Sequence, residues 1–290
     1  MDQMKGIVLA AGSGLRMKPF TSIFSKHLLP ISDKPVIYYS LSILLLAEIR
    51  DILIICNRND LESYKEILGN GNLFGIKLSY EIQEKASGLV DAFKIGERFI
   101  NNSPVALILG DNFFYGHGLK NILLNAKKDL NGAKLFGYHV KNPSSYGIAE
   151  FKGENVSKII EKPKKSISNV AVTGLYFYDN SVCKLSKKVK ASKRGELEIS
   201  SLNQLYLKSN KLNINILHRG FTWFDVGTFE SIFEASNFVQ IIENKQKYLI
   251  GCLEEIALRN NWINKNVIKK NMSRYGNTNY RKYLSLLINT

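Results

Sequence analysis

Cysteine and long apolar runs are both scarce in this sequence. The chain has three cysteines in 290 residues, an odd number without metal-ligand spacing, so neither a disulfide scaffold nor a cysteine metal site is expected. The richest apolar stretch, residues 36–49, is interrupted by Ser40, Ser42 and Glu48 and is too short to cross a bilayer. The first apolar run covers only residues 6–11, which predicts no secretory signal. These absences predict a cytoplasmic protein with no membrane partner.

Acidic residues are also few, with 25 Asp and Glu against 40 Lys and Arg, which leaves a net charge of +15. The basic excess lies mainly in residues 184–194 and 245–282. Neither segment has the interleaved aromatic residues of a single-strand binder, nor a helix-turn-helix or RNP-like pattern. We therefore expect a solvated basic surface that attracts phosphorylated substrates, and no nucleic-acid partner.

The order of the apolar segments predicts one α/β core with a helical C-terminal appendage. In the first half, short apolar runs alternate with amphipathic segments, which is typical of a Rossmann-like, mainly parallel sheet flanked by helices. Pro35 suits a first helical turn, and Asp60 is a candidate N-cap. Strands are predicted at residues 6–10, 51–56, 78–82, 105–109, 134–140, 147–151, 156–161, 171–178 and 213–218, and helices at 35–48, 60–68, 89–99, 119–130 and 280–288. The predicted core is 1–243, divided into parts of about 1–132 and 133–227, and the appendage is 244–290.

A glycine-bearing loop follows the first predicted strand. Gly12 and Gly14 allow backbone N–H groups to approach phosphates closely, and Arg16 adds a fixed positive charge. A dinucleotide-binding fingerprint requires a third glycine where Met17 stands, and a Walker A loop requires a Gly-Lys-Ser/Thr sequence that is absent. The loop therefore predicts a phosphate site of another kind.

Three charged side chains outside this loop are candidates for phosphate chemistry. Lys26 can place a point charge on a phosphate, although a surface lysine is the commoner case. Asp111 follows the predicted strand 105–109 by two residues, at a place where either a Mg²⁺ ligand or a helix cap is expected. Asp225 lies in an apolar, aromatic setting, which is costly for a carboxylate unless it is paired or holds a metal. Asp111 and Asp225 are therefore predicted to hold one Mg²⁺ ion between them.

Several further segments join predicted strands to turns or helices. Gln83 to Gly88 offers an amide and open backbone groups that suit recognition of a base. Tyr146-Gly147, Glu161-Lys162 and Val172-Thr173-Gly174 offer donors and acceptors for sugar hydroxyls and a phosphate. Each of these segments on its own is also compatible with an ordinary turn.

Taken in order, these segments resemble the glucose-1-phosphate thymidylyltransferase family, whose fold is the nucleotidyltransferase fold. The resemblance covers nearly the whole chain and includes Lys26-His27-Leu28-Leu29-Pro30, Gly110-Asp111-Asn112 and Asp225-Val226-Gly227-Thr228. It implies a nucleotide-binding part at 1–132 and a sugar-binding part at 133–227. The residues implied for the nucleotide are Ala11, Gly12, Gly14, Leu15, Arg16, Lys26, His27, Gln83 and Gly88; those implied for the sugar phosphate are Asn112, Gly147, Glu161, Lys162 and Val172.

The resemblance implies a reaction in which dTTP and glucose 1-phosphate give dTDP-glucose and pyrophosphate, with Mg²⁺, as a first step toward dTDP-deoxysugars. It implies catalytic roles for Arg16, Lys26, Asp111 and Asp225, and a homotetramer. Three positions depart from the family, which usually has glycine at Ala11, threonine at Leu15 and glutamine at His27. The departure at His27 leaves a UTP- or CTP-using enzyme as an alternative, and a non-catalytic sugar-nucleotide-binding regulator is a second alternative.

The family also has a second nucleotide-sugar site that inhibits the enzyme. The matching residues here are Tyr115, Gly116, Arg219, Glu255, Ile256 and Arg259. Arg219 and Arg259 can each hold a phosphate by bidentate hydrogen bonds. Glu255 and Arg259 share one face of a predicted helix, where an ordinary surface ion pair is the alternative.

Overall fold

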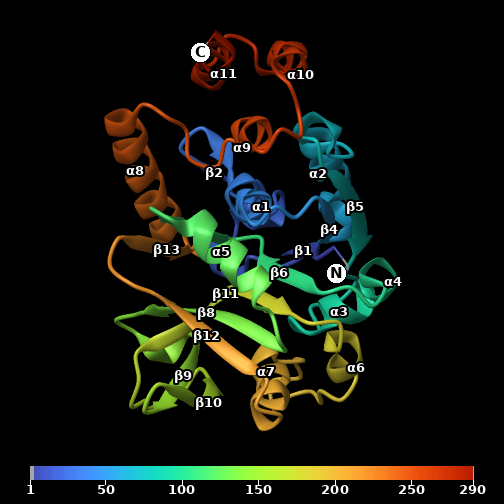
Figure 1. The fold of residues 1–290 in the computed structure, drawn as a ribbon, viewed down its shortest axis with the longest axis vertical. Helices are drawn as coiled ribbons and strands as arrows, with labels where there is room; N and C mark the ends of the chain where they lie inside the picture. The colour runs from blue at the N-terminus through green and yellow to red at the C-terminus, as the bar shows by residue number, and fades with distance from the viewer. Residues whose placement is uncertain (1–2, 290) are drawn as a thin grey trace.

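Side chains alternate along β1 (Lys5–Ala10), and this alternation explains why the central sheet is covered on both faces. Ile7 and Leu9 pack into one hydrophobic core, whereas Val8 and Ala10 pack into another on the opposite face. All four side chains are buried, so neither face of the strand meets solvent. The chain is therefore a three-layer α/β protein, as Figure 1 shows for the computed structural model, which describes residues 3–289.

The main sheet has nine strands within residues 3–289, and its central part is parallel. β1 pairs in parallel with β4 (Asp51–Cys56) on one side and with β6 (Val105–Leu109) on the other. β5 (Lys77–Ile82) extends the parallel part beyond β4. The antiparallel strand β11 (Val170–Tyr178) joins β6 to the β-rich part of the chain. The other strands of that part are β8 (Ala133–His139), β9 (Gly147–Lys152), β10 (Asn155–Glu161) and β12 (Leu212–Leu217).

Helices cover both faces because their apolar side chains fill the two cores. One core contains side chains of α1 (Val36–Leu46), α2 (Leu61–Leu68) and α5 (Leu119–Lys128). The other contains side chains of α3 (Asp91–Ile95), α4 (Glu97–Ile100), α6 (Val182–Ser186) and α7 (Ile199–Lys208).

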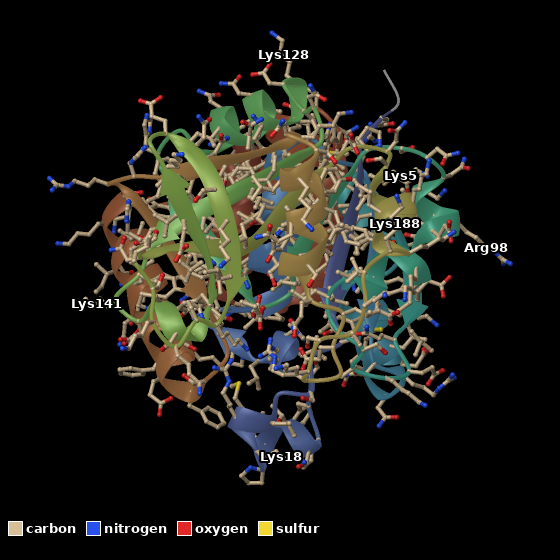
Figure 2. The ribbon with its side chains drawn as sticks, turned by 90° about the horizontal axis from the view of Figure 1, so that it is seen from below. Lys5, Lys18, Arg98, Lys128, Lys141 and Lys188 are labelled. Carbon is tan, nitrogen blue, oxygen red and sulfur yellow. The ribbon has the colours of Figure 1, made fainter. Side chains whose placement is uncertain are left out.

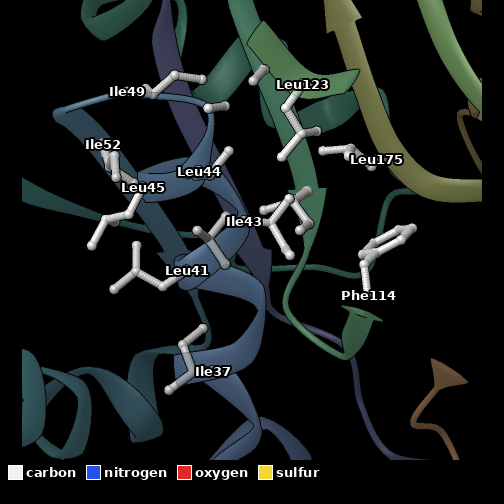
Figure 3. Packing of buried hydrophobic residues seen from close by; sticks show 14 of the residues in the cluster. Ile37, Leu41, Ile43, Leu44, Leu45, Ile49, Ile52, Phe114, Leu123 and Leu175 are labelled. Carbon is white, nitrogen blue, oxygen red and sulfur yellow. The ribbon is translucent and has the colours of Figure 1, made fainter. Parts of the chain in front are cut away.

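α1 is buried around almost its whole circumference, which explains why it is apolar on every side. Figure 3 shows Ile37, Leu41 and Leu44 of this helix packed in one cluster with Leu123 of α5 and Leu175 of β11. Truncating a fully buried leucine such as Leu41 to alanine is expected to cost about 2–5 kcal/mol of stability. The helix therefore anchors the strands whose carboxyl ends carry the candidate site.

A second, two-stranded sheet brings two distant parts of the chain together. β7 (Asn112–Gly116) pairs antiparallel with β13 (Phe221–Asp225), and the register places Asp225 opposite Asn112. α8 (Phe229–Gln246) begins directly afterwards with a capping box, in which Thr228 Oγ1 accepts from Ser231 N and Ser231 Oγ accepts from Thr228 N. The Asp225 segment is therefore held by strand pairing on one side and by the capping box of α8 on the other.

The C-terminal helices form a core of their own at one end of the molecule (Figure 1). This core contains side chains of α9 (Leu253–Arg259), α10 (Lys265–Asn271) and α11 (Asn279–Asn289). They lie near the short hairpin of β2 (Pro30–Ile31) and β3 (Lys34–Pro35). The boundary expected between residues 243 and 244 falls three residues before the end of α8.

Every predicted strand lies within one residue of an observed one, but the strands β2, β3, β7 and β13 and the helices α6 and α7 were not predicted. The predicted helix at 89–99 is wrong, since two short helices replace it and meet at Gly96. A Cβ on Gly96 would approach the Ala92 carbonyl oxygen at 3.0 Å and Ile7 at 3.1 Å, so the chain needs glycine where it bends over the sheet.

Two predicted helix starts also need correction. Pro35 lies before the first turn of α1, in an extended conformation, and Val36 begins the helix. Asp60 does not cap α2 with its side chain. Its carboxylate instead accepts a hydrogen bond from Asn57 Nδ2 at 3.1 Å, and this competing local bond explains the difference.

Basic side chains extend from several sides of the molecule. Figure 2 shows Lys128, Lys141, Lys18 and Arg98 at different edges of the molecule, whereas Lys5 and Lys188 lie near each other. Lys187, in the basic segment 184–194, pairs with Glu97 at 2.5 Å. Within residues 3–289, no helix has the length and apolar character needed to span a membrane.

Candidate active site

Two adjoining cavities open at the carboxyl ends of β1 and β6. The larger has a volume of about 600 Å³ and the smaller about 210 Å³. Leu89, Leu109 and Glu196 line both, so the two cavities share a wall. Ligands of open α/β sheets bind beyond the carboxyl ends of the strands, so this is the expected place for a substrate site.

The smaller cavity collects most of the residues predicted to bind the nucleotide. Its lining includes Ala11, Gly12, Lys26, His27, Gln83, Gly88 and Asp111. Gly14 and Leu15 line neither cavity. Gly14 adopts a left-handed conformation with a φ of 60°, and its carbonyl accepts from Thr21 Oγ1 at 2.7 Å. Leu15 is 66% exposed, so this loop turns away from the site between Ser13 and Arg16.

Gly88 is required by its close approach to another backbone. Its φ is 102°, and a Cβ would lie 2.5 Å from the nitrogen of Leu197. Hydrogen bonds from Leu197 N to Ser87 O and from Val90 N to Leu197 O hold the two segments together. Gln83 donates to Asp91 Oδ2 at 3.2 Å, which fixes its amide at the cavity wall.

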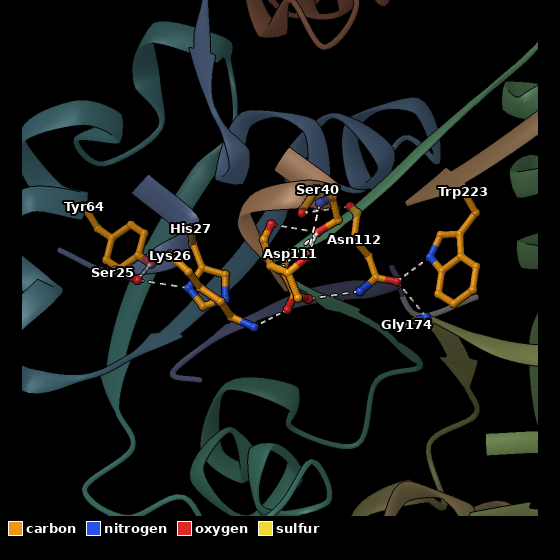
Figure 4. Close-up of polar contacts among 11 residues, drawn as sticks. Ser25, Lys26, His27, Ser40, Tyr64, Asp111, Asn112, Gly174 and Trp223 are labelled. Atoms are coloured by element: carbon orange, nitrogen blue, oxygen red, sulfur yellow. Dashed lines mark hydrogen bonds and ion pairs between the residues drawn. The ribbon is translucent and has the colours of Figure 1, made fainter. Parts of the chain in front are cut away.

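Lys26 and Asp111 form an ion pair (Figure 4). The pair lies beside the glycine-bearing loop that follows β1, residues 11–16, which we call the phosphate loop. Burial alone would raise the pKa of the Asp111 carboxyl, but Lys26, His27 and the Asn112 amide lower it to about 2. The carboxylate is therefore ionised at neutral pH. Lys26 is also close to Gly12, since a Cβ there would lie 3.1 Å from Lys26 Cε.

Asn112 connects three strands through its side chain, as Figure 4 shows. Its Oδ1 accepts from Gly174 N at 2.9 Å and from Trp223 Nε1 at 2.6 Å, and its Nδ2 donates to Asp111 Oδ1 at 3.0 Å. Both acceptor lone pairs are used, so one amide hydrogen remains for a ligand. Asn112 therefore has a structural role in addition to the sugar contact predicted from the sequence.

An irregularity in β11 makes this arrangement possible. Pairing with β8 is interrupted between Val172 and Tyr176, where Thr173 and Gly174 lie. A Cβ on Gly174 would lie 2.6 Å from the Asn112 amide, so only glycine fits. Val172, a predicted sugar-binding residue, lines the larger cavity directly before this irregularity.

Asp225 lies at the end of β13 beside Asp111. Val226 N donates to Asp111 O at 2.9 Å, which ties the two segments together. Burial and the neighbouring Asp111 carboxylate raise the pKa of Asp225 to about 6, despite the opposing effects of Lys26 and Arg16. Arg16 packs directly on Gly227, where a Cβ would be 2.2 Å from Arg16 Nη2. The structure thus brings together the four residues predicted to be catalytic.

These two carboxylates fit the requirements of a Mg²⁺ site. Both are hard oxygen donors, and their mutual repulsion is the condition that a bound cation relieves. Within residues 3–289, no group of three or more His, Cys, Asp or Glu side chains is arranged to hold a metal. Two carboxylates suit Mg²⁺ in particular, because this ion usually keeps water and takes further oxygens from substrate phosphates.

The larger cavity contains the predicted sugar-phosphate residues around Glu161. Glu161 Oε2 accepts from Ser200 Oγ at 3.0 Å, and Oε1 lies 3.6 Å from Arg194 Nη2. A Cβ on Gly147 would come within 3.3 Å of Glu161 Oε2, so glycine leaves room at this carboxylate. Lys162 has a φ of 43°, an uncommon value for a residue with a side chain, and its N–H donates to Tyr146 O at 3.0 Å.

Arg194 and Ser200 were not identified as site residues from the sequence. Arg194 belongs to the basic segment 184–194 that was expected to be a solvated surface; it is exposed, as expected, but it also lines the larger cavity. Its guanidinium pairs with Glu198 at 2.8 Å. One feature of the sequence could have identified Arg194. Two acidic residues follow it in Arg194-Gly195-Glu196-Leu197-Glu198, which interrupts the otherwise basic segment.

The residues of the predicted second site lie on β7, on α9 and in the turn before β13, outside both cavities. Tyr115 on β7 bonds to Gln246 Oε1 at 2.8 Å and to Tyr248 OH at 2.6 Å, and its neighbour Gly116 lies against Phe221. On α9, Glu255 pairs with Arg259 at 2.7 Å, and Ile256 packs against the main core. Arg219 is exposed in the turn before β13. This grouping stays a prediction.

Comparison with known proteins agrees with this geometry. The nucleotidyl transferase family model matches residues 5–241. A glucose-1-phosphate thymidylyltransferase of Neisseria gonorrhoeae is 50% identical over 286 residues, which cover 98% of this chain and 99% of that protein. The enzyme of the same name from Xanthomonas campestris pv. campestris (strain B100) is 45% identical over 288 residues, with 99% and 98% covered. The chain belongs to the glucose-1-phosphate thymidylyltransferase family.

Solved structures place this family in its wider fold. A Bacillus anthracis protein assigned as a glucose-1-phosphate thymidylyltransferase, solved with sucrose, has a TM-score of 0.76 at 37% identity and covers 81% of this chain and 94% of its own. A UDP-glucose pyrophosphorylase solved with UDP-glucose has a TM-score of 0.71 at 26% identity, with 82% and 99% covered. The nucleotidyltransferase fold is therefore shared with enzymes named for different nucleotides.

Proposed function

We propose that this protein joins dTTP to glucose 1-phosphate, forming dTDP-glucose and pyrophosphate with the help of Mg²⁺. The observation that carries the proposal is the pair of adjoining cavities. The smaller is lined by the phosphate loop, Lys26 and Gln83, and the larger by Glu161 and Lys162, with Arg16 and Asp225 beside their junction. Two substrates in these cavities would meet at that junction.

The reaction we propose is an in-line substitution at the α-phosphorus of dTTP. A phosphate oxygen of glucose 1-phosphate forms a bond to that phosphorus while the bond to the bridging oxygen of the β-phosphate breaks, and pyrophosphate leaves with the electron pair. Such a reaction needs alignment and neutralisation of charge rather than a covalent nucleophile on the protein.

Each side chain at the junction has a role that follows from its charge. Lys26 and Arg16 neutralise the charge that develops on the triphosphate, and Lys162 holds the sugar phosphate. Asp111 and Asp225 hold Mg²⁺, which when bound supplies charge neutralisation at the phosphates. Lys26 is already held in place by Asp111, so it does not have to be ordered when the nucleotide binds.

The sugar would be recognised by groups that are fixed before it binds. Ser200 and Arg194 hold the Glu161 carboxylate, whose remaining lone pairs can accept from sugar hydroxyls. Asn112 would add its one free amide hydrogen, and Gly147 and Val172 would supply backbone groups. We further propose a cytoplasmic homotetramer in which the Tyr115 and Arg259 regions hold an inhibitory nucleotide sugar.

A pyrophosphate-release assay tests the proposed function. The purified protein is incubated with each of dTTP, UTP, CTP and ATP against glucose, galactose and mannose 1-phosphates, with and without Mg²⁺. The expected result is fastest release with dTTP and glucose 1-phosphate, and none after chelation. No release with any pair, from folded protein, would contradict the enzymatic proposal. Fastest release with UTP would instead favour the alternative to which His27 and the shared fold with UDP-glucose pyrophosphorylase point.

A further inference from the structure

His27 is enclosed by protein, yet one of its ring nitrogens has no protein partner. The residue is 1% exposed and lines the smaller cavity. Its Nδ1 lies 3.0 Å from Ser25 Oγ (Figure 4), whereas Nε2 has no hydrogen bond to any group in residues 3–289. A polar atom without a protein partner at a cavity wall is positioned to meet a ligand.

The two ring carbons that flank Nε2 show where this nitrogen points. His27 Cε1 is 3.9 Å from the position that a Cβ would take on Gly12, and Cδ2 is 2.9 Å from the equivalent position on Gly110. Nε2 lies between these carbons in the ring, so it faces the gap between the phosphate loop and the end of β6. Lys26 borders the same gap.

Tyr64 sets the direction of the hydrogen bonds that reach Nδ1. Its side chain is fully buried, and its hydroxyl lies 3.0 Å from Ser25 Oγ, the one partner of that hydroxyl within residues 3–289. If Ser25 donated to Tyr64, the phenolic proton would be buried without an acceptor, which costs more than an empty lone pair. Tyr64 therefore donates to Ser25. His27 Nδ1 is then the one acceptor within residues 3–289 for the proton of the Ser25 hydroxyl, so Ser25 donates to His27 Nδ1.

We infer that the Tyr64–Ser25 pair fixes His27 as the tautomer protonated on Nε2, so that it donates a hydrogen bond to an acceptor oxygen of the bound nucleotide. This inference deepens the proposed function and rests on it. Burial, reinforced by the charge of Lys26, lowers the pKa of His27 to about 3, so the ring is neutral under ordinary conditions. A neutral ring with Nδ1 already accepting has one donor left and no acceptor to offer.

A fixed donor distinguishes this site from one that carries a glutamine at the same position. A glutamine side chain presents both an N–H donor and a carbonyl acceptor, and it can rotate to exchange them. His27 presents only N–H, so the partner is an oxygen, either of a phosphate or of a ring carbonyl. An exocyclic amino group at this place would meet a second donor and be rejected.

Nitrogen NMR on protein labelled with ¹⁵N-histidine tests the tautomer directly and does not depend on turnover. The chain has four histidines, and the His27 signals are assigned as those lost in His27→Gln. The expected spectrum at neutral pH shows a protonated Nε2 and an unprotonated Nδ1. A protonated Nδ1, with Nε2 bare or also protonated, overturns the inference even if the protein is fully active.

Calorimetric binding of dTTP tests the role of the relay. Ser25→Ala should weaken dTTP binding about five- to tenfold, the size expected for one oriented hydrogen bond, and Ser25→Thr should restore it. Ser42→Ala is the matched control, since Ser42 is equally buried and bonds to Tyr39 O at 2.7 Å away from the cavity. Equal affinities in Ser25→Ala and Ser42→Ala overturn the inference.

Thymidine identifies which oxygen accepts the hydrogen bond. If Ser25→Ala weakens thymidine and dTTP equally, the acceptor is a ring carbonyl. If only dTTP is weakened, the acceptor is a phosphate oxygen. Both results support a donor at His27, whereas a loss of glucose 1-phosphate affinity alone would place His27 outside the nucleotide site and overturn the inference.

Discussion

Replacing Asn112 by alanine removes the acceptor that holds three strands together at the site. Gly174 N and Trp223 Nε1 both donate to Asn112 Oδ1, and both are buried. Without this oxygen each donor loses its partner, at a cost of about 1–3 kcal/mol per donor. The expected loss in the free energy of unfolding is therefore about 2–6 kcal/mol, a large share of the roughly 5–15 kcal/mol typical of folded domains.

Urea unfolding followed by tryptophan fluorescence measures this loss, because Trp223 is one of two tryptophans and is itself a partner in the network. Asn203→Ala is the matched control. Asn203 is also fully buried, but its side chain has a single bond, from Tyr178 OH at 2.6 Å, and its Nδ2 has no partner within residues 3–289. Asn112→Ala should lose about twice as much stability as the control. An equal or smaller loss would refute the argument that Asn112 binds the strands together.

Three further predictions concern charge. Asp111→Asn and Asp225→Asn should each lower kcat about 10²-fold or more at saturating substrates, because metal-assisted stabilisation of the transition state is worth several kcal/mol. Both variants should keep the fold. Near-normal kcat at low Mg²⁺ in either variant would contradict a shared metal site. His27 has a folded-state pKa of about 3, below its ordinary 6.5, so the unfolded chain takes up the proton first and stability is lost as pH falls from 6.5 towards 3. In urea unfolding without Mg²⁺, the native protein should therefore lose about 2 kcal/mol more than His27→Gln between pH 6.5 and 5, and equal losses would contradict this account. Arg259→Ala should weaken inhibition by dTDP-rhamnose and leave uninhibited turnover nearly unchanged; unchanged inhibition would show that the second site is absent.

The strands of the core were predictable because each is a short, separate apolar run. β4 and β6 have the bounds that their sequences predict, since a strand buried on both faces stands out from its polar flanks. From that frame, the topology of a parallel sheet predicts that Gly12 and Asp111 meet at one edge. Several of the other residues that line the smaller cavity are ones that the family resemblance implies for the nucleotide.

Elements whose formation depends on distant partners were not predictable in the same way. β7 and β13 are short aromatic segments, and their pairing joins Asn112 to Asp225 across more than a hundred residues. α7 follows Glu198, which is a poor helix cap and makes no capping bond. Arg194 is similar, because only the fold brings Glu161 to its guanidinium and places this exposed charge at the rim of a cavity.

Asn112 shows why individually weak motifs become informative together. Asp111 lies between β6 and β7, and Asn112 begins β7. Gly174 comes from the irregular part of β11, and Trp223 and Asp225 come from β13. Glycine is needed at 174 because the Asn112 side chain occupies the place of its Cβ. The Asn112 side chain is held there by donors from Gly174 and Trp223 and by its own bond to Asp111. A substitution in any one segment would leave a buried donor or a collision in another. The three motifs are therefore parts of one physical arrangement, which the hydrogen bonds of Asn112 join.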